Sequence, residues 1–542
     1  MIGLTGIAGV TGLLGLAGQP LPVEPDAIRR PAVDWGAAAP VLVLGGGALL
    51  LMLMASFARD RTATTRYTVV TCLVALGTIA AAVPLWREVH DADRGPFTTL
   101  GGAVGVDGFS TFLTVVIAAS VLLAALFADG YLRREHLEGV EPYVLLLLSA
   151  SGGVIMAAAD DLIVLFLGLE ILSIAVYVLA ALHQRRLTSQ EAGMKYLVLG
   201  AFSSAFFLYG IAMIYGGTGT TSLVRIAELF STSALAEDGL ILAGLALLLV
   251  GLGFKVAAVP FHFWTPDVYQ GAPSPMVAWM ASGVKVAGFA GMMRVFMLAF
   301  SAYSVDWQPM VYALAVATLL VGSILAVVQT DVKRMLAYSS ISHAGFVLVG
   351  VQAASQQGVE SALFYLATYA FLIAGSFGVV TLVGRRGDGH HDLADYRGLG
   401  RARPGLALVL AIFLFAQAGV PLTSGFFAKF YVISAAVDAG STWLAVVAML
   451  SAVIAAYLYL RIVASMYMAD EAVEGDGASA AASGAVAGAP GAAAPAVGRV
   501  NVPAAAGLAL TVCLVVTVGV GVWPGLITEV AHDAVPVLTA VG

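Results

Sequence analysis

The chain holds five lysines, and four of them fall inside long apolar runs: Lys195, Lys255, Lys285 and Lys429. Glu170 also stands among apolar neighbours, in the run Leu-Gly-Leu-Glu-Ile-Leu. A buried lysine can give up its proton, whereas an arginine in practice cannot. We therefore interpret these side chains as candidate carriers in a path for protons.

The cost of burying these charges supports a function for them. Each ionised group near the centre of a membrane span costs about 2.5–3.5 kcal/mol on insertion scales. Glu170, Lys255, Lys285 and Lys429 together would cost roughly 10–14 kcal/mol, similar to the net stability of a whole domain. Charges that only hold helices together are the alternative, and we favour the functional interpretation.

The position of each lysine in its apolar run separates the candidates. Lys255 lies five residues before Pro260, which should break the helix and free carbonyl groups that a protonated Lys255 can bind. Lys285 is eleven residues past Ser274, about 16 Å into its span.

The other two lysines differ in their expected depth. Lys429 follows Pro421 by eight residues, so it also stands next to a break. Lys195 is only a few residues inside its run. For Lys195, reaching the surface along its flexible stem is as good an interpretation as a role in the path.

Two histidines suit a proton relay, because imidazole titrates near neutral pH. His343 is twelve residues past Asp331 and close to mid-membrane, and His262 follows Pro260 by two residues. A histidine that is simply satisfied by one neighbour is the structural alternative for each of them.

Composition identifies the setting in which these residues act. Of 542 residues, 60% are hydrophobic and 11% are charged, which is too little polar surface for a water-soluble protein. A net charge of −7 without a basic block excludes a nucleic-acid binder. Cys72 and Cys513 lie in separate runs, which excludes a zinc site, an iron–sulfur cluster and a disulfide scaffold. The chain is predicted to be a membrane protein with many spans.

The apolar runs predict an all-α fold, since a span needs roughly 20 apolar residues in a helix. We expect about fourteen transmembrane helices, near 37–57, 67–86, 108–129, 143–158, 161–182, 191–216, 238–260, 274–300, 309–329, 332–352, 359–384, 404–436, 441–469 and 502–528.

Arginines predict the orientation of these helices. They gather in the odd-numbered loops, from Arg59 in the first loop to Arg403 in the eleventh. The positive-inside rule then places the odd loops in the cytoplasm and both termini outside. Arg294 and Arg461 stand toward the ends of spans, and we expect both to reach the surface.

An internal repeat is visible as well. Asp161 and Asp331 each precede a helix, and the seventh and twelfth helices carry the breaks Val259-Pro260 and Val420-Pro421. These matches predict two five-helix units, helices 4–8 and 9–13, which must be inverted because five is odd. The predicted parts are an extension (1–36), helices 1–3 (37–130), two repeats (143–300 and 309–469), an Ala/Gly-rich linker (470–500) and a last helix with the C-terminus (501–542).

The run around the first break is highly specific. It reads Gly-Phe-Lys-Val-Ala-Ala-Val-Pro-Phe-His-Phe-Trp-Thr-Pro-Asp-Val-Tyr-Gln-Gly-Ala-Pro, from Gly253 to Pro273. It resembles the signature of the antiporter-like membrane subunits of respiratory complex I, the NADH–quinone oxidoreductase, in the form found in subunit N. Gly168-Leu-Glu170, Ser-Gly-Val-Lys285, the run ending in His343 and the run around Lys429 support this resemblance.

The resemblance implies proton translocation in the membrane arm of such a complex, in a bacterial inner membrane. It implies that Glu170 pairs with Lys255, that Lys285 lies at the centre of a polar axis and that Lys429 is the exit group. It implies no redox centre in this chain, with FMN, iron–sulfur clusters and quinone in partner subunits. Its partners would be the sister antiporter-like subunits and small membrane subunits.

Two other functions use the same residues. A subunit of a multi-subunit cation/proton antiporter would need almost the same buried chain, so the lysines do not discriminate between the two. A scaffold that only seals the membrane arm is the third interpretation, in which the buried charges are inert.

Overall fold

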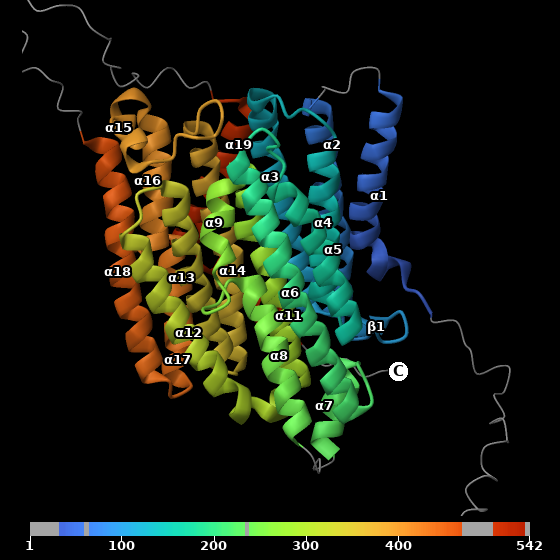
Figure 1. Cartoon of the computed structure of the whole chain (residues 1–542). Helices are drawn as coiled ribbons and strands as arrows, with labels where there is room; N and C mark the ends of the chain where they lie inside the picture. Colours follow the sequence, from blue (N-terminus) through green and yellow to red (C-terminus); the bar gives the residue numbers. More distant parts are fainter. Residues whose placement is uncertain (1–31, 59–63, 233–237, 469–501, 537–542) are drawn as a thin grey trace, which may run out of the picture.

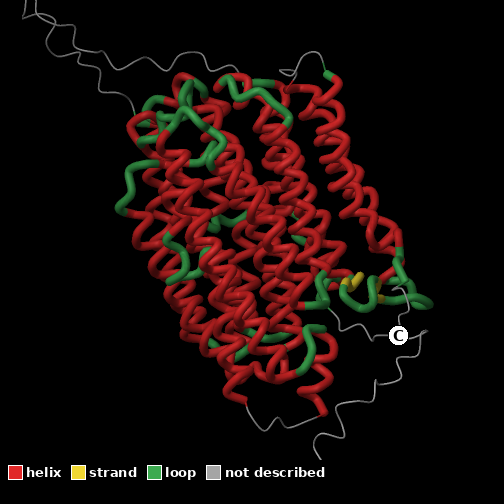
Figure 2. Tube along the Cα trace, turned by 45° about the vertical axis from the view of Figure 1, so that its right-hand side comes forward, coloured by secondary structure: helices red, strands yellow, loops and turns green. Residues whose placement is uncertain are grey.

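The computed structural model describes residues 32–58, 64–232, 238–468 and 502–536. Within these ranges the chain forms a bundle of long, roughly aligned helices, and a short β hairpin lies at one end of it (Figures 1 and 2). The predicted linker, 470–500, and residues 1–31 of the predicted extension lie outside the described ranges.

Ten helices and strands of the described ranges precede the first break. They are α1 (Trp35–Phe57), α2 (Thr64–Val89), β1 (Phe97–Thr99), β2 (Val104–Val106), α3 (Gly108–Glu135), α4 (Glu141–Ala158), α5 (Leu162–Ala180), α6 (Leu187–Thr218), α7 (Leu223–Thr232) and α8 (Asp238–Val256).

The remaining elements complete the bundle. They are α9 (Trp264–Gly271), α10 (Ser274–Trp279), η2 (Met280–Val284), α11 (Lys285–Met293), η3 (Arg294–Ala299), η4 (Ser301–Tyr303), α12 (Ser304–Val327), α13 (Val332–Gln352), α14 (Gln356–Val383), η5 (Leu393–Tyr396), α15 (Leu399–Ala402), α16 (Pro404–Ala418), α17 (Ser424–Asp438), α18 (Thr442–Tyr467), α19 (Ala504–Val522) and α20 (Gly525–Asp533).

The all-α prediction with many spans is confirmed, and thirteen of the about fourteen predicted spans have a counterpart of sufficient length. Thirteen helical segments in the described ranges are long and apolar enough to cross a membrane. The fourteenth predicted span, 404–436, is divided between α16 and α17, each of 15 residues. Neither half is long enough alone, because a span needs roughly 20 residues.

Both predicted breaks are present in the fold. α8 ends at Val256 and α9 begins at Trp264, with Pro260 between them, and α16 and α17 are separated around Pro421. Each gap contains a residue with left-handed backbone, Ala257 (φ 63°) and Leu422 (φ 65°). The helix is therefore interrupted at corresponding places in the two predicted repeats.

Two interruptions in one span were not predicted. The expected span 274–300 contains two π-helical stretches, η2 and η3, and Lys285 directly follows η2. At Gly283 an added Cβ would lie 2.0 Å from the Trp279 ring, so this position requires glycine. Short π-helical stretches are frequent at functional sites. Neither stretch contains a proline, which is the signal by which the other two breaks were predicted.

Two backbone bridges hold the starts of α5 and α13. Each start is capped by an aspartate, Asp161 or Asp331. The bridging bonds are Leu162 N to Thr221 O (2.9 Å), Leu223 N to Asp160 O (2.8 Å), Val332 N to His391 O (2.7 Å) and Leu393 N to Thr330 O (2.8 Å). The same arrangement at both places supports the repeat, which itself stays a prediction.

Arg294 contradicts the expectation that it reaches the surface. Its side chain is 0% exposed and forms ion pairs with Asp107 (2.7 Å) and Asp160 (3.1 Å). It also donates to the carbonyl of Ala157 at 2.9 Å. Arg461, by contrast, is partly exposed, and its guanidinium group donates to the carbonyls of Val327 and Gln329 at the end of α12. Position in a span did not reveal these partners, because they come from other helices.

Replacing Arg294 by Met should destabilise the fold strongly, because Asp107 and Asp160 would lose the cation they share. Removing one partner from a buried ion pair costs about 3–5 kcal/mol. The measurement is the thermal unfolding midpoint of the full chain in detergent, with exposed Arg401→Gln as the control. A midpoint equal to that of the unmodified chain would contradict this role for Arg294.

Candidate functional site

Lys255 and Glu170 lie near each other but bind different partners. Lys255 Nζ donates to Ser173 Oγ at 2.8 Å, while Glu170 Oε1 accepts from Ser204 Oγ. Glu170 and Ser173 are three residues apart on α5 and so share one face. The ion pair between Glu170 and Lys255 that the resemblance implies is not formed in this structure. Lys255 instead bonds to Ser173, which lies beside Glu170 on α5.

The carbonyl groups freed at the first break have partners other than Lys255. Phe254 O accepts from Trp264 Nε1 at 3.0 Å, and Gly253 O accepts from Ala258 N at 2.8 Å. The expectation that freed carbonyls hold Lys255 is therefore wrong, and a hydroxyl holds it. Lys255 is 3% exposed, so its ammonium group depends on this one hydroxyl and on nearby aromatic rings.

Lys285 binds α13. Its Nζ donates to Ser340 O at 2.5 Å and to Ser340 Oγ at 2.6 Å. The side chain is 3% exposed, and the Tyr369 ring lies 5.7 Å from Nζ. The mid-span position predicted for Lys285 thus places its ammonium group among hydroxyl groups inside the bundle.

His343 lies on the same helix as Ser340 and bonds with both ring nitrogens. Nδ1 lies 2.6 Å from Tyr365 OH, and Nε2 lies 3.1 Å from Tyr459 OH. The tautomer decides which atom donates in each pair. A histidine with a hydroxyl group on each side has the geometry of a relay, because a proton can arrive at one nitrogen and leave from the other.

Lys429 is held by the second break. Its Nζ donates to Gln417 O at 2.8 Å and to Ala418 O at 2.9 Å. These carbonyls belong to the last turn of α16, where the helix stops and leaves them without helical partners. Freed carbonyls therefore do bind a lysine in this fold, at the second break and not at the first.

Polar side chains fill the space between Lys285 and Lys429. Ser339 Oγ lies 2.6 Å from Tyr459 OH and 3.4 Å from Gln417 Oε1, and Gln417 Nε2 donates to Ser376 Oγ at 2.7 Å. Ser339 precedes Ser340, so the step from the Lys285 partner to this group runs along the α13 backbone. A polar line thus extends between the two lysines, in which the steps from Ser340 to Ser339 and from the Gln417 side chain to its own carbonyl run through covalent bonds and not through hydrogen bonds.

Sequence reasoning missed several members of this line. They are Ser339, Ser340, Tyr365, Ser376, Gln417 and Tyr459. A usable signal existed for the serines, because hydroxyl groups are dense in the run Tyr-Ser-Ser-Ile-Ser-His of an otherwise apolar span. Gln417 and Tyr459 gave little signal, since each is a single polar residue in its own span.

Lys195 and His262 lie outside this line. The Lys195 side chain is 42% exposed and pairs with Glu191 (2.6 Å) and Asp267 (2.8 Å). His262 is 5% exposed, and its Nδ1 has no hydrogen-bond partner among the described residues. The structure thus brings together Lys285, His343 and Lys429, places Glu170 and Lys255 in a second group, and leaves these two apart.

A buried aspartate joins several elements at the end of the bundle that carries the arginine-rich loops. Asp388 is 0% exposed and accepts from five side chains: His391 Nε2 (2.8 Å), Ser274 Oγ (3.0 Å), Arg186 Nη1 (3.2 Å), Lys333 Nζ (3.2 Å) and Tyr131 OH (3.3 Å). Burial alone would raise the pKa of Asp388, but the positive charges around it hold that pKa well below its ordinary value.

The sequence did not single out Asp388, because the run Gly-Asp-Gly-His-His around it is typical of an exposed loop. Its carboxylate fixes the loop after α14 against α10 and α13. Lys333 also donates to Ala272 O at 2.7 Å, just before α10. The cluster therefore fixes the junction of α9 and α10 against the rest of the bundle.

In the part of the chain that the structure describes, no group of three or more His, Cys, Asp or Glu side chains could hold a metal ion. The ionisable groups of the bundle interior are instead spread singly along the hydrogen-bonded line and the two breaks. Such an arrangement can pass protons between neighbouring groups, and a lysine that can bind or release a proton stands at each end of the polar line.

Comparisons with known proteins agree with this arrangement. The family model described as the transmembrane part of NADH:quinone oxidoreductase and the Mrp antiporter matches residues 159–455. NADH-quinone oxidoreductase subunit N of Acidothermus cellulolyticus is 39% identical over 95% of this chain and 98% of its own. The corresponding subunit of Trichlorobacter lovleyi is 42% identical over 81% of this chain and 86% of its own.

Solved structures show the same fold. A chain of respiratory complex I from Thermus thermophilus has a TM-score of 0.72 and 30% identity, covering 90% of this chain and 98% of that one. A chain of the Mrp complex from Dietzia has a TM-score of 0.75 at 22% identity, covering 93% and 97%, which is a likeness of fold alone. The chain belongs to the NADH:quinone oxidoreductase/Mrp antiporter transmembrane family.

Proposed function

We propose that this chain is a proton-translocating subunit in the membrane arm of an NADH:quinone oxidoreductase. The observation that carries the proposal is the buried polar line from Lys285 to Lys429, in which hydroxyl groups and His343 can exchange protons up to the amide of Gln417. The names of the relatives, NADH-quinone oxidoreductase subunit N, support the choice of complex.

The proposed setting is a bacterial inner membrane with the arginine-rich loops in the cytoplasm and both termini outside. The division into two inverted repeats is part of the proposal, and the corresponding breaks and bridges support it. Quinone reduction elsewhere in the complex would drive transport. Moving each proton against the membrane potential costs about 2.3 kcal/mol per 100 mV, which this chain does not supply by itself.

In the proposed order of proton transfers, Lys255 first takes a proton from the cytoplasm. Glu170, on the same face of α5 as Ser173, stabilises the resulting charge. The proton then passes toward Lys285, and by way of His343 and hydroxyl groups toward Lys429 and the outside. Ser173 supports the first step because its hydroxyl accepts from Lys255 Nζ at 2.8 Å, while its own proton is donated to Leu169 O. Lys195 and His262 are proposed to act before these steps, on the cytoplasmic side and at the first break.

The amide of Gln417 separates two stretches of this line. A hydroxyl or an imidazole can pass a proton on, but an amide side chain does not take up and release one near neutral pH. Gln417 also supplies its backbone carbonyl to Lys429. We infer that Gln417 holds Lys429 in place and insulates it from Ser339 until Lys429 moves.

The proposed cofactors lie in partner subunits: FMN and iron–sulfur clusters where NADH is oxidised, and quinone where the electrons leave. No redox centre is proposed for this chain. Proposed partners are the sister antiporter-like subunits and small membrane subunits. Purifying the full chain in mild detergent and identifying the proteins that accompany it tests this assignment.

A subunit of a multi-subunit cation/proton antiporter is the second candidate, favoured by the similar fold of the Mrp chain. Accompanying subunits that oxidise NADH would support the first function, and cation-antiporter subunits would support the second. A scaffold with inert charges is the third; full proton transport after neutralising both Glu170 and Lys285 would favour it.

Replacing Lys285 by Met should abolish proton translocation, because the line loses the group that can take and release a proton. Lys285→Arg should keep the charge without restoring transport, since arginine does not release its proton. The measurement is the number of protons moved per electron in membrane vesicles, with the assembled complex quantified in parallel. A normal ratio in both variants would refute the role of Lys285.

Replacing Gln417 by Glu should open a proton leak, because a carboxyl group can carry a proton between Ser339 and Lys429. The leak is measured as the decay of an imposed pH gradient across vesicles without substrate. Gln417→Met, which has a similar size and no proton to exchange, is the control and should show no leak. Equal decay for Gln417→Glu and the unmodified protein would contradict the insulating role.

A further inference from the structure

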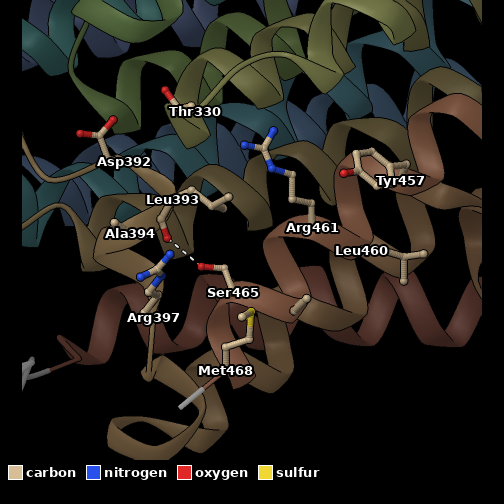
Figure 3. A pocket seen from close by; sticks show the side chains of 11 residues that line it. Thr330, Asp392, Leu393, Ala394, Arg397, Tyr457, Leu460, Arg461, Ser465 and Met468 are labelled. Carbon is tan, nitrogen blue, oxygen red and sulfur yellow. Dashed lines mark hydrogen bonds between the residues drawn. The ribbon is translucent and has the colours of Figure 1, made fainter. Parts of the chain in front are cut away.

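A cavity of about 820 Å³ lies beside the last turns of α18 (Figure 3). It is formed by α18, by the segment around η5 and by Thr330 before α13. Two arginines from different elements line it, Arg461 on α18 and Arg397 directly after η5. Arg461 is six residues before the end of α18, about 9 Å along the helix.

The arginine side chains present positive charge to the cavity. Arg461 uses Nη1 to bind Val327 O (2.7 Å) and Gln329 O (2.9 Å), which fixes its guanidinium group against the end of α12. Within the described residues, neither Arg461 nor Arg397 forms an ion pair with a carboxylate. Two cations beside one cavity, of which Arg461 is fixed by carbonyl groups, favour an anionic occupant.

One carboxylate, that of Asp392, also lines the cavity. Asp392 caps η5 together with Asp395, so its side chain is engaged with the backbone of that short helix. One negative charge against two positive ones leaves the lining positive. Ser465 is also oriented by the protein, since its Oγ donates to Leu393 O at 2.8 Å.

An exposed apolar strip runs along α18 into the same cavity. Its members recur at helical spacing: Trp443, Val446, Met449, Leu450, Val453, Tyr457 and Leu460. Tyr457 and Leu460 belong both to the strip and to the cavity lining, and they are 58% and 53% exposed. The strip is about 25 Å long, which is comparable to the hydrocarbon layer of a membrane.

We propose that this cavity binds the headgroup of an anionic phospholipid whose acyl chains lie along the α18 strip. The phosphate would face Arg397 and Arg461, and the apolar strip would exclude a free soluble anion as the preferred ligand. The arginine-rich end of the bundle is the end assigned to the cytoplasm, where anionic lipids concentrate negative charge. The site does not depend on the polar line for protons.

The test measures binding of fluorescent phosphatidylglycerol to the full chain in detergent, against phosphatidylcholine and inorganic phosphate as competitors. Phosphatidylglycerol should bind more tightly than phosphatidylcholine, and phosphate should displace it poorly. Arg397→Gln should weaken phosphatidylglycerol binding about tenfold, which corresponds to about 1.4 kcal/mol. Arg397 is the preferred position because no hydrogen bond of its side chain to the described fold would be lost.

Arg401→Gln is the matched control, since Arg401 is exposed in the same region and does not line the cavity. It should leave lipid binding unchanged. Equal binding of the two lipids, full displacement by inorganic phosphate, or no effect of Arg397→Gln would each overturn the proposal. Lipid binding that is present in the isolated chain but absent from the intact complex would assign the strip to a partner subunit and overturn it as well.

Discussion

Each backbone carbonyl and each charge inside this bundle needs a partner within the protein, because a hydrocarbon layer offers none. The break after α16 satisfies both needs at once. The carbonyls of Gln417 and Ala418 lose their helical partners there, and Lys429 supplies the missing donors. A lysine and an interrupted helix, each unfavourable alone, stabilise each other, and the polar line ends at this contact.

The two breaks solve the same problem differently. At the first, Trp264 and Ala258 satisfy the carbonyls, and Lys255 turns to the hydroxyl of Ser173. At the second, the carbonyls themselves hold the lysine. A hydroxyl both donates and accepts, whereas a carbonyl only accepts. The first lysine thus has a partner that can relay a proton, and the second has a partner that can only retain the ammonium group.

Charges at the ends of the bundle have a different role. Arg294 with its aspartates, and Asp388 with its five donors, are fully buried and bring together elements far apart in the sequence. Burying such charges costs desolvation energy, and the attraction between them offsets this cost only when their geometry is good. These clusters therefore fix the relative positions of the helices that carry the lysines. Fixed positions are needed because each hydrogen-bonded step of the polar line depends on a single hydrogen bond.

Much of the fold could be predicted from local pattern. Runs of about 20 apolar residues predict spans, a proline inside a run predicts a break, and Lys285 and His343 were expected near mid-membrane from counting residues. Contacts between helices could not be predicted in this way. Arg294 was expected at the surface because its own helix places it near an end, yet its partners come from α3 and the start of α5.

The sequence by itself determined that the chain is a helical membrane protein, where its two proline breaks lie and that Glu170, Lys255, Lys285, His343 and Lys429 stand within its spans. These properties follow from composition and spacing along one helix, where 3.6 residues per turn and 1.5 Å per residue set depth and face. Only the tertiary structure decided which partner each group binds. Ser173 for Lys255, Ser340 for Lys285 and Gln417 for Lys429 lie on different helices or across a break, so only packing brings them together.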